Sequence, residues 1–134
     1  MSASNATEND ISTWMATGTS PAWASATTYL RLYSSDPGEA GTATTNEISY
    51  TGYDGVVMAK PASWSVSGNT RSNAALVQFP LCTGGTATAT HFGECSTQNG
   101  AGQLIVSGAL TASLSISNGI QPQFNTGELD IVID

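Results

Sequence analysis

Apolar and polar residues alternate along most of the chain from residue 29 onward. In the segment from Tyr29 to Tyr33, Leu30 and Leu32 share one parity, and the two tyrosines share the other with Arg31. Because successive side chains of a strand point to opposite faces, this segment predicts a half-buried β-strand. Further strands are predicted at residues 55–60, 63–66, 74–79, 87–92, 103–110, 112–116, 121–125 and 129–133. Clusters of Gly, Asn, Ser and Pro separate these segments, which indicates an all-β fold, an antiparallel β-sandwich or barrel, and we predict the sandwich.

One helix is predicted, close to the start of the chain. Ile11, Trp14 and Met15 follow one another at i, i+3 and i+4, Thr7 is a candidate N-cap, and the helix is expected to end by Gly18. A helix this short is marginal alone and must dock on something. It either packs on its own sandwich, which we favour, or forms an arm that reaches a neighbouring subunit.

The chain is expected to form one domain preceded by a short arm. Residues 1–25 are taken as the N-terminal arm with its helix, and residues 26–134 as the β-sandwich domain. Turn formers fill residues 34–41, which predicts an exposed loop. Since the chain has 134 residues and no repeat or long linker, it can bury one core without metal or disulfide staples.

The small number of cationic residues and the negative net charge exclude some classes of partner. Only 10% of the residues are charged, and 3 Lys and Arg stand against 10 Asp and Glu, which gives a net charge of -7. Binding to phosphate groups requires clustered cations, so we expect neither nucleic acid nor an anionic membrane as a partner. No stretch approaches the roughly 18 apolar residues of a spanning helix, and residues 1–10 resemble no signal peptide, so we expect a soluble protein.

Metal and cofactor sites are not predicted. Cys82, His91 and Cys95 are three candidate zinc ligands without a CxxC knuckle, whereas structural zinc sites use four ligands. The interpretation that we prefer is two buried thiols and a histidine bonded to backbone. A disulfide between the two cysteines is the less favoured alternative, because a reducing cytoplasm keeps thiols free.

Catalytic residues are not predicted either. The chain has no G-x-S-x-G elbow, no phosphate-binding loop and a single histidine. His91 and Cys95 would lie roughly 13 Å apart along an extended strand, too far for a thiolate–imidazole pair. Two of the acids could converge as a glycosidase pair, but none stands in an aromatic-rich context. We therefore expect that the protein is not an enzyme.

A set of local motifs, in this order and spacing, resembles a family of small bacteriophage virion proteins. The family includes capsid decoration (cement) proteins and proteins described as tail-fibre proteins. The motifs cover most of the chain and lie at Trp14 and at residues 29–33, 36–42, 46–48, 52–53, 72–75, 79–80, 90–93, 104–110 and 124–129. The chain departs from the family pattern at Glu94 to Ser96 and at Lys60.

The resemblance implies a β-sandwich, with the jelly roll as one type, that assembles on a virion as a small symmetric homo-oligomer such as a trimer. It implies a capsid decoration protein that is made in the host cytoplasm, binds the major capsid protein on the outer surface of the head and stabilises the assembled shell. A tail-fibre or receptor-binding component is the alternative. A hydrolase of host polysaccharide is a second, less favoured one.

Aromatic and apolar residues near the start of the chain are the candidate contact residues, because aromatic side chains dominate interface energetics. Trp64 is expected to fill the core instead. The interface candidates are Ile11, Trp14, Met15, Trp23, Tyr29 and Tyr33.

Overall fold

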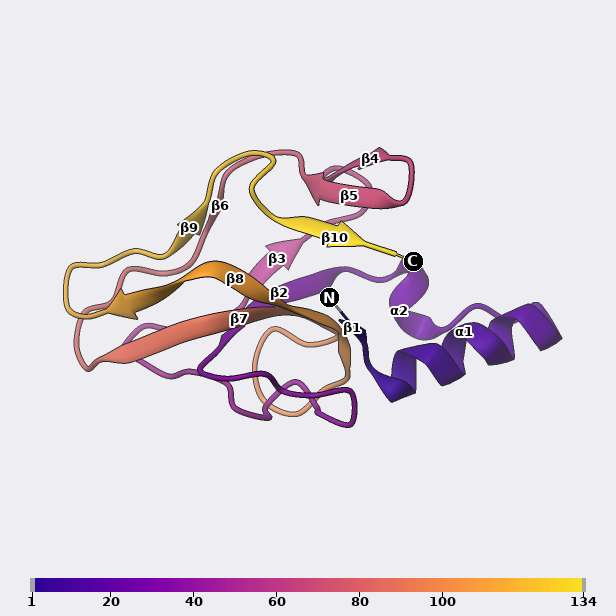
Figure 1. The fold of residues 1–134 in the computed structure, drawn as a ribbon, viewed down its shortest axis with the longest axis horizontal. Helices are drawn as coiled ribbons and strands as arrows, with labels where there is room; N and C mark the ends of the chain where they lie inside the picture. Colours follow the sequence, from indigo (N-terminus) through magenta and orange to yellow (C-terminus); the bar gives the residue numbers. More distant parts are fainter. Residues whose placement is uncertain (1, 134) are drawn as a thin grey trace.

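The computed structural model of the protein describes residues 2–133. Met1 and Asp134, the outer ends of the arm and of the sandwich domain predicted above, lie outside the described residues. The elements in chain order are β1 (Ser2–Ala3), α1 (Asn5–Thr17), α2 (Ala22–Ser25), β2 (Thr28–Tyr33), β3 (Val56–Met58), β4 (Trp64–Ser67), β5 (Thr70–Asn73), β6 (Val77–Gln78), β7 (Ala87–Cys95), β8 (Leu104–Ile116), β9 (Gln123–Phe124) and β10 (Asp130–Val132) (Figure 1).

The strands form three antiparallel sheets. The main sheet has the order β1-β8-β7-β2-β3, and two small sheets have the orders β10-β5-β4 and β6-β9. The small sheets lie over one face of the main sheet (Figure 1). One cluster of buried side chains joins the layers, with Leu30 and Phe92 from the main sheet and Val77 and Ile131 from the small sheets. The protein is therefore an antiparallel β-sandwich with a short N-terminal helix, as the alternating pattern predicted.

Part of the opposite face of the main sheet is buried as well. Tyr33, Ala43, Cys95 and Leu104 form a second cluster beneath the loops of residues 34–55 and 96–103. Tyr33 comes close to the β7 backbone, since a Cβ on Gly93 would lie 2.8 Å from the tyrosine ring. The strand predicted at residues 29–33 is thus confirmed, but the prediction that one of its faces is exposed is wrong, because the loops cover its polar face.

Arg31, on this covered face, has a fully buried side chain. Its guanidinium donates to the carbonyl oxygens of Ala43, Thr97 and Gly100 at 3.0–3.1 Å. It also donates to the carboxylate of Glu47 at 3.2 Å and to the hydroxyl of Thr97 at 3.2 Å. A buried charge is tolerated only where such partners replace water, so this side chain ties both loops to β2.

The observed strand boundaries differ from the predicted ones, because pairing between strands helps to decide where a strand begins and ends. The segments 103–110 and 112–116 belong to one strand, β8, whose pairing with β7 shifts register between Ala89 and His91. This β-bulge places residues 110–113 outside the ladder. The segment 74–79 contains only the two-residue strand β6, and β5 was not predicted. The sequence of β5, Thr-Arg-Ser-Asn, lacks the apolar alternation on which the strand predictions relied.

Helix α1 begins earlier than predicted. Ser4 is the N-cap, and its hydroxyl accepts a hydrogen bond from the Thr7 amide. Thr7 lies inside the helix, so its predicted role as the cap is wrong. Gly18 ends the helix in the left-handed conformation at φ 76°, which a glycine adopts without strain, and this end agrees with the prediction.

Replacing Arg31 by Met should lower the free energy of unfolding by about 3–5 kcal/mol, because the Glu47 carboxylate and several carbonyls lose their buried donor. Urea denaturation followed by fluorescence measures this change. Val66→Ser alters an exposed side chain and should change the free energy of unfolding by less than about 0.5 kcal/mol. A loss below about 1 kcal/mol for Arg31→Met would show that the two loops do not depend on the guanidinium.

Candidate interaction surfaces

The base of helix α1 is fastened to the sandwich by polar contacts. The Ser4 hydroxyl donates to the carbonyl of Leu104 in β8. The Gln103 amide donates to Asp10 Oδ2 at 3.0 Å, and the Trp23 indole N–H donates to the same oxygen at 2.8 Å. These bonds connect α1, α2 and the start of β8, so they set the direction in which the helix leaves the sheets.

The far half of α1 projects beyond the sheets (Figure 1). Trp14 is 44% exposed and Met15 is 82% exposed, whereas Ile11 is half-buried. We call these three residues the helix tip. The favoured expectation, that this apolar stripe packs on its own sandwich, is therefore wrong for Trp14 and Met15. The polar contacts at the helix base hold α1 in place without covering its tip.

The remaining interface candidates lie elsewhere. Trp23 is half-buried beside α1, and the Lys60 ammonium lies 5.9 Å from its ring centroid. Tyr29 is half-buried on β2. Tyr33 is fully buried and its hydroxyl donates to the carbonyl of Ala43, so its assignment as a contact residue is wrong. Alternation placed it on the outer face, but the loop that follows β2 covers that face.

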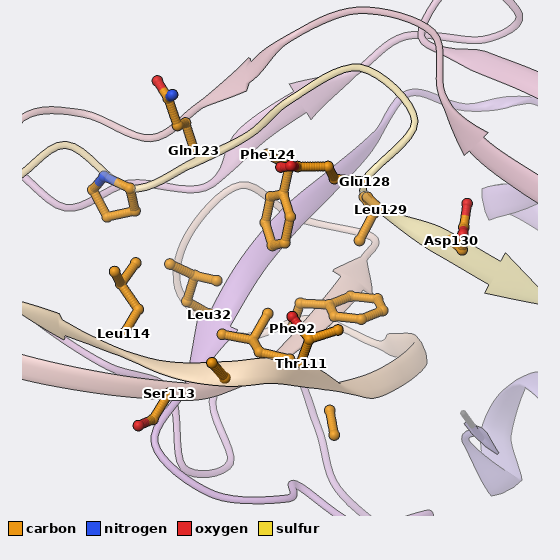
Figure 2. Close-up of a pocket in the computed structure, with 14 residues that line it drawn as sticks. Leu32, Phe92, Thr111, Ser113, Leu114, Gln123, Phe124, Glu128, Leu129 and Asp130 are labelled. Atoms are coloured by element: carbon orange, nitrogen blue, oxygen red, sulfur yellow. The ribbon is translucent and has the colours of Figure 1, made fainter.

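A groove with a volume of about 540 Å³ opens between the bulged part of β8 and the segment 122–130. Figure 2 shows Phe124 pointing across the groove toward Phe92, with Leu32 and Leu114 along the same wall. The two aromatic rings meet edge to face, with centroids 6.3 Å apart. Most of this lining is apolar.

The sequence did not reveal this groove. Its walls are built from β2, β7, β8 and the segment 122–130, which are far apart along the chain. Leu110 and Leu114 have the same parity, but they were predicted to lie on two separate strands. That shared parity was the one signal in the sequence that the two leucines lie on one wall of a groove. The bulge that turns both residues toward the groove depends on pairing with β7, which the sequence does not show.

The buried acids are engaged in structural pairs. Glu94 accepts hydrogen bonds from Arg71 and from the Thr28 hydroxyl, and so connects β5 to β7 and β2. The Arg71 guanidinium lies 4.3 Å from the ring centroid of Trp64, which packs against the core as expected. The ion pair therefore holds the Glu94 carboxylate inside the sandwich.

Glu47 has its pKa raised above the ordinary value of 4.5, chiefly because burial removes its carboxylate from water. Arg31 and a hydrogen bond from the Tyr53 hydroxyl, at 3.0 Å, act in the opposite direction. Burial also raises the pKa of the Tyr53 hydroxyl itself. These groups stabilise the covered face of the sheet rather than open into a cleft.

The two cysteines are buried thiols in different clusters. Cys82 donates to the carbonyl of Gly84 at 3.3 Å, and the Cys95 sulfur lies 3.1 Å from the Tyr33 hydroxyl. Burial raises the pKa of the Cys95 thiol to about 11. Within residues 2–133, no three His, Cys, Asp or Glu side chains come together in a way that could hold a metal ion, so the candidate set with His91 is not assembled.

Comparison with known families identifies the chain. The geometry defines a small antiparallel β-sandwich with one projecting helix and one apolar groove. The model of the family described as podophage GP4 fiber I protein gp80 matches residues 2–132, and the chain belongs to this family. It is thus a bacteriophage virion structural protein, as its motifs had suggested. A search of curated proteins found no match.

None of the helices described in residues 2–133 is long and apolar enough to cross a membrane.

The raised pKa of Glu47 predicts a pH dependence of stability. The folded state binds the proton more tightly than the unfolded state, so the contribution of this group is fully present below about pH 4.5 and is lost as the pH rises through the folded pKa. Relative to Glu47→Gln, the wild type should therefore become more stable on acidification from pH 7. Melting curves of both proteins between pH 4 and 7, taken in about half-unit steps, measure the difference. A difference that does not vary with pH would contradict the assignment.

The thiols should be inert in the folded protein. Because both side chains are fully buried, Ellman's reagent is expected to leave native protein unmodified and to label Cys82 and Cys95 after unfolding in guanidinium without reductant. Rapid labelling of the native protein would mean that one sulfur is accessible. Failure to label the unfolded protein would reveal a disulfide.

Proposed function

We propose that the protein is a structural, non-catalytic subunit of a fibre on the phage particle. The observation that carries the proposal is the family match over residues 2–132, because the description of that family names a fibre protein. In this role the protein works by making contacts with other virion subunits and with further copies of itself. The exposed helix tip and the apolar groove support such a role, since unpartnered apolar surfaces of this kind mark protein contacts.

The distribution of charge supports protein partners over nucleic acid or membrane. All three cationic side chains are engaged within the chain: Arg31 pairs with Glu47, Arg71 pairs with Glu94, and Lys60 donates to a carbonyl oxygen of α2. Phosphate groups would have to compete with these contacts. The net charge of -7 also disfavours an anionic surface as a partner.

Capsid decoration, with the major capsid protein as partner and the outer head surface as location, is the second candidate. The shape of the described chain favours capsid decoration. Residues 2–133 form one sandwich and contain no stalk, and the longest helix among them has 13 residues. A cement protein needs no stalk, because it stabilises a shell by binding the assembled form. Both candidates place the protein on the virion.

Labelling of intact particles distinguishes the two candidates. Gold-coupled antibody against the purified protein, followed by electron microscopy, is expected to mark the fibres. Particles that lack the gene product serve as the control, and they should lose the fibre density together with the label. Regular labelling over the head would overturn the proposal in favour of decoration. Absence of label from otherwise complete particles would overturn both.

A further inference from the structure

We propose that the groove beside β8 binds the helix tip of a second copy of this chain, so that copies associate head to tail. This contact would supply the self-association of the protein. It goes beyond the proposed function, and it can be tested in solution whatever the location of the protein on the virion.

The helix is suited to insertion. Ile11, Trp14 and Met15 present anchors at i, i+3 and i+4, the pattern by which an amphipathic helix lies in an apolar groove. A helix of 13 residues is marginal in water without a partner, and only Thr7 of α1 is buried within the chain. The contacts of Asp10 with Trp23 and Gln103 hold the helix base, so little orientational freedom remains to be lost on binding.

The groove provides matching chemistry. Phe92, Phe124 and Leu114 line an open apolar space, and Leu110 adds to it from the bulge. The volume of about 540 Å³ falls within the range of roughly 300–1,000 Å³ that binding pockets occupy. It can therefore accommodate the large side chains of a helix tip.

The positions of the two surfaces require that the contact be intermolecular. Helix α1 leaves the sheets at one end of the molecule, whereas β9 and the end of β8 lie toward the other end (Figure 1). The helix spans only about 20 Å and its base is fixed, so it cannot fold back into its own groove. Two different surfaces then meet, which makes the contact heterologous: repeated, it closes into a ring or extends into a filament.

The lack of charge on the inserted residues permits a second copy as the occupant. The chain carries a charge of -7, so self-association is disfavoured wherever acids face each other. Residues 11–17 of α1 and the floor of the groove contain no charged side chain. The two acids at the groove rim are engaged locally, Glu128 with the backbone and side chain of Asn125 and Asp130 with the Ser72 hydroxyl. Residues 11–17 can therefore enter the groove without burying a charge, and Glu8, which shares a helix face with Ile11 and Met15, lies at the base of the helix.

Complementary variants test the proposal. Trp14→Ala/Met15→Ala removes the two exposed apolar side chains of the helix tip, and alanine preserves the helix. Ala112→Glu places a charge in the groove at an exposed position of the bulge. Analytical ultracentrifugation over a concentration series should show self-association of the wild type and monomers for each variant alone. An equal mixture of the two variants should form a 1:1 dimer, because one supplies an intact groove and the other an intact helix.

Ala40→Glu, which adds the same charge in the exposed loop 34–41, is the matched control and should associate like the wild type. Unchanged melting temperatures of the variants exclude misfolding as the cause of a lost association. Three results would each overturn the proposal: a wild type that is monomeric at all concentrations, a groove variant that still associates, or a mixture that remains monomeric. Association of the groove variant alone would indicate that the helix tips bind each other.

Discussion

The buried guanidinium of Arg31 is the interaction on which the arrangement of the chain depends. Removing a charge from water is costly, and the cost is offset here only because carbonyl groups and one carboxylate surround it. These acceptors come from two loops, one that follows β2 directly and one that lies 66 to 69 residues beyond Arg31 in the sequence. The loops must therefore close over the polar face of the main sheet, and in closing they bury Tyr33 and Cys95 beneath them.

The apolar surface that is left for partners lies at the margins of the main sheet. The small sheets cover one face, the loops cover the part of the other face around Tyr33 and Cys95, and the helix tip and the groove remain as the apolar features described above. A local feature of the backbone or of the side chains positions the helix tip, and another positions the groove. Polar contacts of Asp10 hold the helix away from the sheet, and the bulge in β8 opens the groove.

A structural subunit of a phage particle is expected to have such a covered core with apolar contact surfaces at its margins. Its own cations are used to hold the fold together, which leaves an acidic surface of low charge density. Contacts with other subunits then depend on apolar surface and shape, with few ion pairs available to guide them. Membership in a family of fibre proteins agrees with such a role.

The sequence by itself determined the fold class, the approximate strands, the Gly18 end of the helix and the apolar stripe of the helix tip. These follow from local periodicity and backbone preference, which short segments carry alone. Only the tertiary structure decided which faces are buried, which apolar residues remain exposed, and where the groove lies. Tyr33 and Trp14 make the difference clear: one is covered by a loop and the other is held clear of the sheet. Contacts between distant segments decide burial, and no local pattern records them.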